Sequence, residues 1–300
     1  MNTSVEQTLE TIHAMRRQEE FAYSVSDYLS SLPQQTNSAL DTPVDASCRN
    51  LMAKWCNEIA DFCKYKKETV AIAMNCLDRF MASPSGYEIL MDRNKYQLAA
   101  MTALYSSVKV HEQEAMDPKL VSTLSRGVHS AQAVEAMESK MLNAIQWRVN
   151  PPTAMSFVRS MMDLIPDHLM HSSDKDAVTD IARIQVETIV NEYDFCTVKT
   201  SSIAFACALN AMESVVADGM LIAEFESNMG KTMMVDESCV QDLRNAIYEL
   251  VNGSDITATI QMNIKNHLAK SNTSGSRHVA TNKDYNNIHT SPKSVQNALY

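Results

Sequence analysis

The segment KYQLAAMTALYSSVKV at residues 95–110 decides the fold of this chain. Small or apolar side chains occupy nearly every side of the helix that it predicts. A helix that is apolar all round must be surrounded by other helices. Its alanines and serines would let those neighbours approach closely. The segment therefore predicts the central helix of a helical bundle.

The flanking sequence predicts the other members of this bundle. Residues 46–63 and 67–81 carry apolar side chains at helical spacing, and the stretch PSG at 84–86 then breaks the pattern. Downstream, Asp117-Pro118 predicts a cap and a first-turn proline, and a further helix is expected over about 131–146. The region therefore predicts five helices in roughly 100 residues.

The stretch Asn150-Pro151-Pro152-Thr153 separates this region from a second helical set. Within that set the stretch SIAFACALNAM is again small and apolar all round. The expected domains are an N-terminal amphipathic helix with a linker, two helical repeats and a tail, at 1–45, 46–150, 151–253 and 254–300. The helices expected outside the first repeat cover about 5–32, 153–165, 174–195, 201–217 and 237–251.

The composition excludes several classes of protein. A formal net charge of −10 disfavours nucleic acid as a partner, and no stretch reaches the roughly 18 apolar residues of a membrane helix. With six glycines there is no phosphate-binding Gly-rich loop, and the seven cysteines form no metal-ligand pairs. We expect no cofactor, no metal and no enzyme activity, since no nucleophile or histidine constellation is found. Cysteines among apolar residues indicate reduced thiols in the nucleus or cytoplasm.

Three segments resemble the cyclin family. They are CRNLMAKWCNEIADFCKYKKETVAIAMNCLDRFMAS at 48–83, QLAAMTALYSSVKVHE at 97–112 and AMESKMLNAIQWRVNPPTAMSFV at 136–158. Within the family, their sequences resemble D-type cyclins most, although the L-x-C-x-E motif of that group is absent. The resemblance implies an all-α cyclin fold of two five-helix repeats and a non-catalytic subunit that binds and activates a cyclin-dependent protein kinase in cell-cycle control.

The resemblance also implies a kinase-binding set. The matching residues are Lys109, Glu138, Val110, Leu142, Trp147 and Val149. Lys109 ends an apolar helix, where its ammonium would lie beside carbonyl oxygens, and Glu138 interrupts an apolar stripe. A structural pair between the two charges, or a solvated edge of the stripe, is the alternative for them. For the four apolar residues the alternative is ordinary core.

Two further sets match positions of the family. Arg49 and Asp78 are expected to form an internal salt bridge between the helices at 46–63 and 67–81. A substrate-recruitment groove for Arg-x-Leu peptides is expected at Cys48, Leu51, Met52, Trp55, Glu58 and Gln97. The alternative is that this stripe packs inward. Cys48 stands where a methionine is usual, and Lys54, where an acidic residue is usual, would repel the peptide's arginine.

One other function remains open from the sequence. A cyclin-fold adaptor in transcription that activates no kinase would share the helical pattern. The general initiation factor of that kind is basic and usually carries a zinc ribbon, whereas this chain is acidic and lacks such cysteine pairs.

Overall fold

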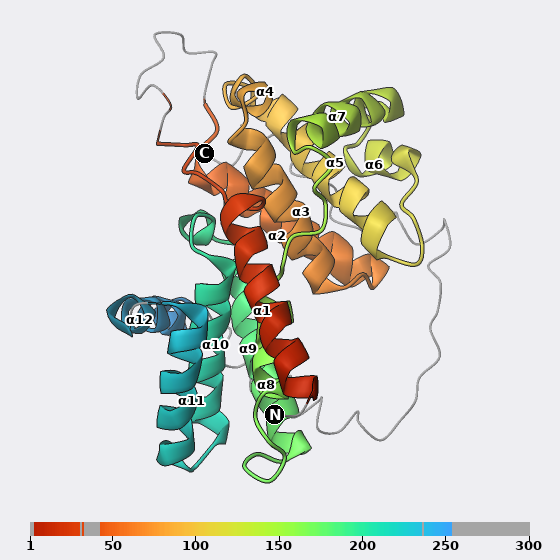
Figure 1. Cartoon of the computed structure of the whole chain (residues 1–300). Helices are drawn as coiled ribbons and strands as arrows, with labels where there is room; N and C mark the ends of the chain where they lie inside the picture. The colour runs from red at the N-terminus through yellow and green to blue at the C-terminus, as the bar shows by residue number, and fades with distance from the viewer. Residues whose placement is uncertain (1–2, 31, 33–42, 236, 254–300) are drawn as a thin grey trace. The chain divides into compact units, whose positions relative to one another are not determined.

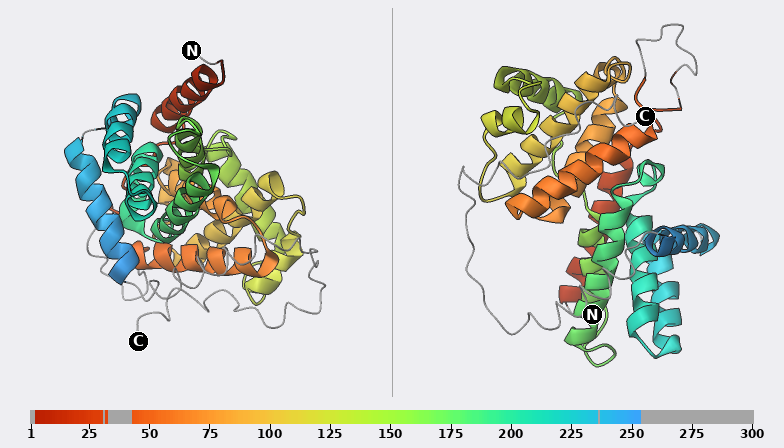
Figure 2. Two further views of the ribbon diagram at one scale, coloured as in Figure 1. Left: turned by 90° about the horizontal axis from the view of Figure 1, so that it is seen from below. Right: turned by 180° about the vertical axis from the view of Figure 1, so that it is seen from behind.

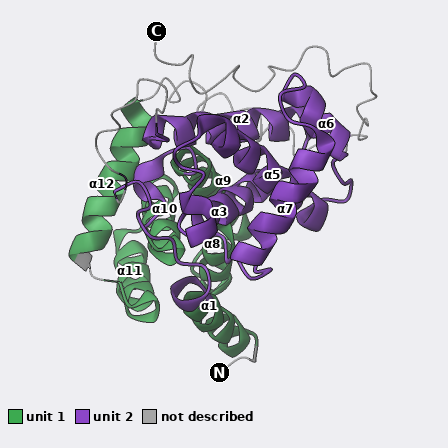
Figure 3. Ribbon diagram, turned by 90° about the horizontal axis from the view of Figure 1, so that it is seen from above, with its two compact units in different colours: residues 1–17, 154–189, 198–282 green, residues 18–153, 190–197, 283–300 purple. Residues whose placement is uncertain are grey.

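The computed structural model describes residues 3–30, 32, 43–235 and 237–253. Within these residues the chain is helical and contains no strand, and helices make up 73% of the structure. The chain divides into two compact units (Figure 3). Unit 1 contains the described residues of 1–17, 154–189 and 198–282, and unit 2 contains those of 18–153 and 190–197. The expected all-α class is confirmed.

Unit 2 is organised around one central helix, α5 (Arg93–His111). Four helices contact it, and they come from both sides of it in the sequence (Figure 1). They are α2 (Ala46–Cys63), α3 (Lys67–Met81), α6 (Pro118–Leu124) and α7 (Ala131–Ala144), and a short helix α4 (Pro84–Tyr87) follows α3. The segment at 95–110 is therefore the centre of the bundle, as its composition predicted.

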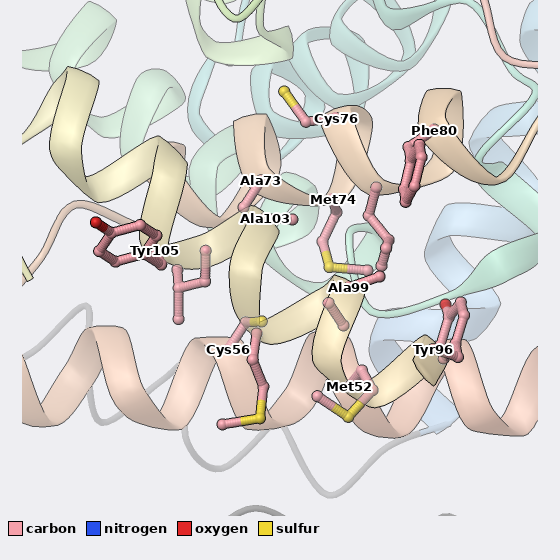
Figure 4. Close-up of a cluster of buried hydrophobic side chains, with 14 of the residues drawn as sticks. Met52, Cys56, Ala73, Met74, Cys76, Phe80, Tyr96, Ala99, Ala103 and Tyr105 are labelled. Atoms are coloured by element: carbon pink, nitrogen blue, oxygen red, sulfur yellow. The ribbon is translucent and has the colours of Figure 1, made fainter. Parts of the chain in front are cut away.

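Side-chain size explains how these helices approach one another (Figure 4). Ala99 and Ala103 of α5 are at most 1% exposed, and their small side chains leave room for larger neighbours. Met52 of α2 and Met74 of α3 lie beside Ala99, and both are buried, as is Phe80 of α3. Close packing of this kind stabilises a core mainly through burial of apolar area.

Carboxylates begin several of these helices. Asp45 accepts a hydrogen bond from the Cys48 backbone N at 2.8 Å, and Asp117 accepts one from Lys119 N at 2.8 Å. A side-chain acceptor at this position satisfies a backbone N–H that has no partner within the helix. The cap expected from Asp117-Pro118 is therefore present.

Unit 1 repeats the arrangement around α10 (Thr200–Val215), which contacts four other helices. They are α8 (Ala154–Asp163), α9 (Ser172–Ile189), α11 (Gly219–Met233) and α12 (Glu237–Gly253), and α11 and α12 can be followed beside α10 in Figure 2. Helix α1 (Thr3–Phe21) begins in this unit, where Arg16 Nη1 donates to the Thr232 carbonyl at 3.1 Å.

Three helices differ from the sequence expectation. Helix α1 ends at Phe21 rather than near residue 32. Within the remainder of the expected helix, the Asp27 carboxylate accepts from the backbone N–H groups of Leu29 and Ser30 and forms a turn. Helix α9 ends at Ile189, and residues Tyr193–Phe195 form a separate 3-10 turn. Helix α11 was not among the helices expected from the sequence, which left 218–236 unassigned.

Two expected segments lie outside the described residues. They are most of the linker expected over 34–44 and the tail expected over 254–300. In the part of the chain that is described, no helix combines the length and hydropathy that a membrane span requires.

Candidate functional site

The C-terminal end of α5 meets the middle of α7 through an ion pair. Lys109 Nζ lies 3.0 Å from Glu138 Oε1 and 3.1 Å from Oε2, and Ser106 Oγ donates to Oε1 at 3.2 Å. The Lys109 ammonium also lies 5.1 Å from the centroid of the Tyr105 ring. Partial burial acts to lower the pKa of Lys109, but its hydrogen bond to Glu138 and the charge of that carboxylate outweigh the burial, so the pKa is raised.

This pair is open to solvent on one side. The Lys109 side chain is 42% exposed and that of Glu138 is 14% exposed. An ion pair with this exposure contributes about 0–1 kcal/mol to stability. The pair is therefore a weak internal support, and its Lys109 ammonium remains accessible to a partner.

Two large apolar side chains of the expected kinase-binding set are exposed. Val110 follows Lys109 and is 54% exposed, and Trp147 lies just beyond α7 and is 66% exposed. Leu142 and Val149 are partly buried against the core. We refer to Lys109, Val110, Glu138, Leu142, Trp147 and Val149 as the α5–α7 face. The exposure of Val110 and Trp147 excludes ordinary core for these two residues, whereas Leu142 and Val149 do contribute to packing.

The turn after α7 has an unusual backbone. Gln146 and Trp147 both adopt left-handed conformations, with φ of 57° and 59°. Neither residue is glycine, and each such conformation costs on the order of 1 kcal/mol or more. The Trp147 backbone N donates to the Leu142 carbonyl at 2.8 Å, and its indole Nε1 donates to Asn143 Oδ1 at 3.2 Å. The ring is thus held outward in one orientation.

Two residues that the sequence analysis did not assign hold this region together. The Arg79 guanidinium donates to the carbonyls of Arg148 at 2.7 Å and Ile145 at 3.1 Å. Glu112 accepts from Lys66 N at 2.9 Å and so joins the end of α5 to the start of α3. Arg79 belongs to the LDRF stretch, but its partners are backbone carbonyls, so the sequence carries no signal that assigns it.

Arg49 and Asp78 form the internal ion pair that the resemblance implied. Arg49 Nη2 lies 2.9 Å from Asp78 Oδ2, and both side chains are buried. Tyr28 donates its hydroxyl to Asp78 Oδ1 at 2.9 Å, and Arg49 Nη1 donates to the Val190 carbonyl. Burial is the largest single influence and acts to lower the pKa of Arg49, but the charge of Asp78, its hydrogen bond to Arg49 and the nearby Tyr28 and Tyr96 together outweigh it, so the pKa is raised above its ordinary value. The buried charges are therefore satisfied on several sides.

The six residues of the expected recruitment groove are mostly covered. Cys48, Met52, Trp55 and Gln97 are buried, Leu51 is partly buried, and Glu58 is exposed. Gln97 Oε1 is hydrogen-bonded to His129 Nε2 at 3.1 Å. Burial raises the pKa of the Cys48 thiol to about 12, so the thiol stays protonated at neutral pH. This placement favours the alternative in which the stripe packs inward.

The described residues hold no group of three or more His, Cys, Asp and Glu side chains placed to bind a metal ion. The described residues form a helical fold of two repeats, and the first repeat carries the α5–α7 face, which is partly apolar and partly charged. Two family models match the chain in succession: the cyclin N-terminal domain over residues 10–150 and the cyclin C-terminal domain over residues 152–285. The chain belongs to the cyclin family.

Curated relatives include G2/mitotic-specific cyclin-2 of Antirrhinum majus, which is 24% identical over 62% of this chain and 39% of its own length. Cyclin-A2-1 of Arabidopsis thaliana is 24% identical over 54% of this chain and 35% of its own length. G1/S-specific cyclin-E1 of Rattus norvegicus is 28% identical over 38% of this chain and 27% of its own length. The chain thus spans well under half the length of these relatives, and the leaning towards D-type cyclins stays a prediction.

Solved structures share the fold. A viral cyclin from herpesvirus saimiri superimposes with a TM-score of 0.59, at 12% identity over 80% of this chain and 96% of the viral chain. A chain of the CAK complex from Chaetomium thermophilum bound to ATP-gamma-S superimposes with a TM-score of 0.50, at 12% identity over 93% of this chain and 94% of that chain.

Proposed function

We propose that this chain is a regulatory subunit that binds and activates a cyclin-dependent protein kinase in cell-cycle control. The single observation that carries the proposal is the α5–α7 face, which combines a partly exposed ion pair with the exposed side chains of Val110 and Trp147. Aromatic anchors are typical of the centre of protein interfaces, and charged side chains are more common at the rim. The names of the relatives, which are mitotic and G1/S cyclins, support a role in the cell cycle.

The proposed mechanism is one of positioning. Residues of the α5–α7 face dock against the mobile helix of the kinase that carries its catalytic glutamate, and hold that glutamate against the catalytic lysine. Lys109 and Glu138 would each exchange water for hydrogen bonds to the kinase, while Trp147 and Val110 bury apolar area. The chain supplies no catalytic group, so all chemistry belongs to the kinase.

A purified panel of monomeric cyclin-dependent kinases tests this proposal. Each kinase is titrated with the chain, and phosphorylation of a Ser-Pro peptide is measured at each step. We expect at least one kinase to bind saturably and to gain activity in parallel with binding. Binding without a gain in activity would support the alternative of a cyclin-fold adaptor in transcription. Absence of binding across the panel would contradict the proposal.

A further inference from the structure

Arg79 lies beneath the turn that carries Trp147. Its Nη1 donates to the Arg148 carbonyl at 2.7 Å and its Nη2 donates to the Ile145 carbonyl at 3.1 Å. These carbonyls stand on either side of Gln146 and Trp147, the two left-handed residues. One planar guanidinium therefore bridges both ends of the turn.

The surroundings of Arg79 are unusual for a buried cation. Its residue is 9% exposed, and its guanidinium carbon lies 4.8 Å from the centroid of the Tyr23 ring. Its other polar contact is Asn75 Oδ1 at 3.4 Å. The guanidinium thus contacts carbonyl and amide oxygens and the face of an aromatic ring. Some of these oxygens lie at the C-terminal end of α7, which is the negative end of the helix dipole. A buried charge needs such partners, so the guanidinium and the turn depend on each other.

We propose that Arg79 is a positioning residue for Trp147: by joining the carbonyls of Ile145 and Arg148 it holds the left-handed turn that presents the indole ring. The role of the ring in kinase binding rests on the function proposed above, whereas the effect of Arg79 on the turn does not. A lysine cannot replace this arginine, because an ammonium is a point donor and does not span two carbonyls with a fixed planar fork.

The experiment follows the two indole N–H signals of the chain by nuclear magnetic resonance. The chain has two tryptophans, the buried Trp55 and the exposed Trp147, and a Trp147→Phe variant assigns the signals. The test variants are Arg79→Lys and Arg79→Met. The matched control is Arg244→Lys in unit 1, because Arg244 is 8% exposed and donates to Asn210 Oδ1 at 2.9 Å. Thermal unfolding and kinase binding are measured on every variant.

We expect both Arg79 variants to shift or broaden the Trp147 indole signal and to leave that of Trp55 in place. Kinase affinity should fall roughly tenfold, because a preorganised contact is lost. Arg244→Lys should leave both signals and the affinity unchanged, even where it lowers the unfolding midpoint. An unchanged Trp147 signal in Arg79→Lys would overturn the inference.

A second variant separates the turn from general stability. Glycine adopts positive φ without a Cβ penalty, so Gln146→Gly lowers the cost of the turn. Added to Arg79→Lys, it should return the Trp147 signal towards its original position and recover part of the affinity. Failure to recover either would contradict the assigned role. If the unmodified chain binds no kinase, the proposed function fails while the indole signals still decide the role of Arg79.

Discussion

The guanidinium of Arg49 lies 2.9 Å from the carboxylate of Asp78, and the two side chains are 4% and 3% exposed. Arg49 donates two hydrogen bonds to this carboxylate, from Nη2 at 2.9 Å and from Nε at 3.4 Å, and Tyr28 donates a third at 2.9 Å. The pair therefore joins α2 to α3 at a place that water does not reach. Removing one partner would leave a buried charge with only carbonyl and hydroxyl groups to face.

Asp78→Ala should lower the free energy of unfolding by about 3–5 kcal/mol, because the Arg49 charge loses its counter-ion. Asp61→Ala is the control, since Asp61 forms a surface pair with Lys67 and is 66% exposed. That change should cost no more than about 1 kcal/mol. Denaturant unfolding measures both. Equal, small effects in the two variants would show that the Arg49–Asp78 pair does not stabilise the unit.

His129 should make the stability depend on pH. Burial lowers the pKa of His129, and the nearby charge of Asp92 only partly opposes this. Because the folded pKa lies below the unfolded one, the unfolded chain binds a proton first as pH falls, and the stability present above about pH 6.5 is progressively lost. The unfolding midpoint should therefore fall further between about pH 7.5 and about pH 5.5 in the unmodified chain than in His129→Gln. Identical pH profiles of the two proteins would rule out this contribution.

A peptide titration tests whether the expected recruitment groove binds an Arg-x-Leu peptide. Because Cys48, Met52 and Trp55 are buried and Gln97 is bonded to His129, we expect no saturable binding of an Arg-x-Leu peptide. Lys54→Glu removes the repulsion of the peptide's arginine and tests whether charge alone prevents binding. Tight binding by Lys54→Glu would show that the groove opens in solution and that Lys54 is what closes it to substrates.

Trp147→Ala should lower kinase affinity by roughly 30-fold or more, since central aromatic residues contribute about 2 kcal/mol or more to binding. Its effect on the unfolding midpoint should be small, because the ring is 66% exposed. Tyr248→Ala is a matched control in α12, where the tyrosine is 67% exposed. Binding titration and thermal unfolding of both variants test the assignment. Equal affinity in the two variants would contradict it.

The sequence predicted the helices of the first repeat closely, because their boundaries depend on local signals. Apolar spacing bounds α2 and α3 at the expected residues, and Asp117-Pro118 begins α6. The end of α1 and the whole of α11 escaped prediction. The residues after Phe21 leave the helix although their apolar pattern continues, and the Asp27 carboxylate forms a separate turn at 27–30.

The candidate site was only partly predictable. Lys109 and Glu138 stood out because a charge at each position contradicts an apolar pattern, and their proximity depends on how α5 packs against α7. Arg79 could not be assigned, because its partners are backbone carbonyls, which carry no sequence signal. The groove residues could not be placed either, because one apolar stripe suits both a binding surface and a core.

The ion pair of the α5–α7 face leads to the central prediction. Lys109→Ala and Glu138→Ala should each change the free energy of unfolding by no more than about 1 kcal/mol, because Lys109 is 42% exposed and water weakens its attraction to Glu138. At an interface each charge is desolvated, and its loss typically costs about 2–5 kcal/mol of binding free energy. Because both residues act through one shared contact, the double variant should lose less affinity than the sum of the single variants.

The most direct measurement uses the kinase that the chain activates in the panel experiment. This kinase is titrated with the unmodified chain, Lys109→Ala, Glu138→Ala and the double variant, and the thermal unfolding of each protein is measured alongside. The account predicts that each single variant binds roughly 30-fold or more weakly while its unfolding midpoint stays close to that of the unmodified chain. Normal kinase binding by both single variants would contradict the account, and so would unfolding of both in place of weaker binding.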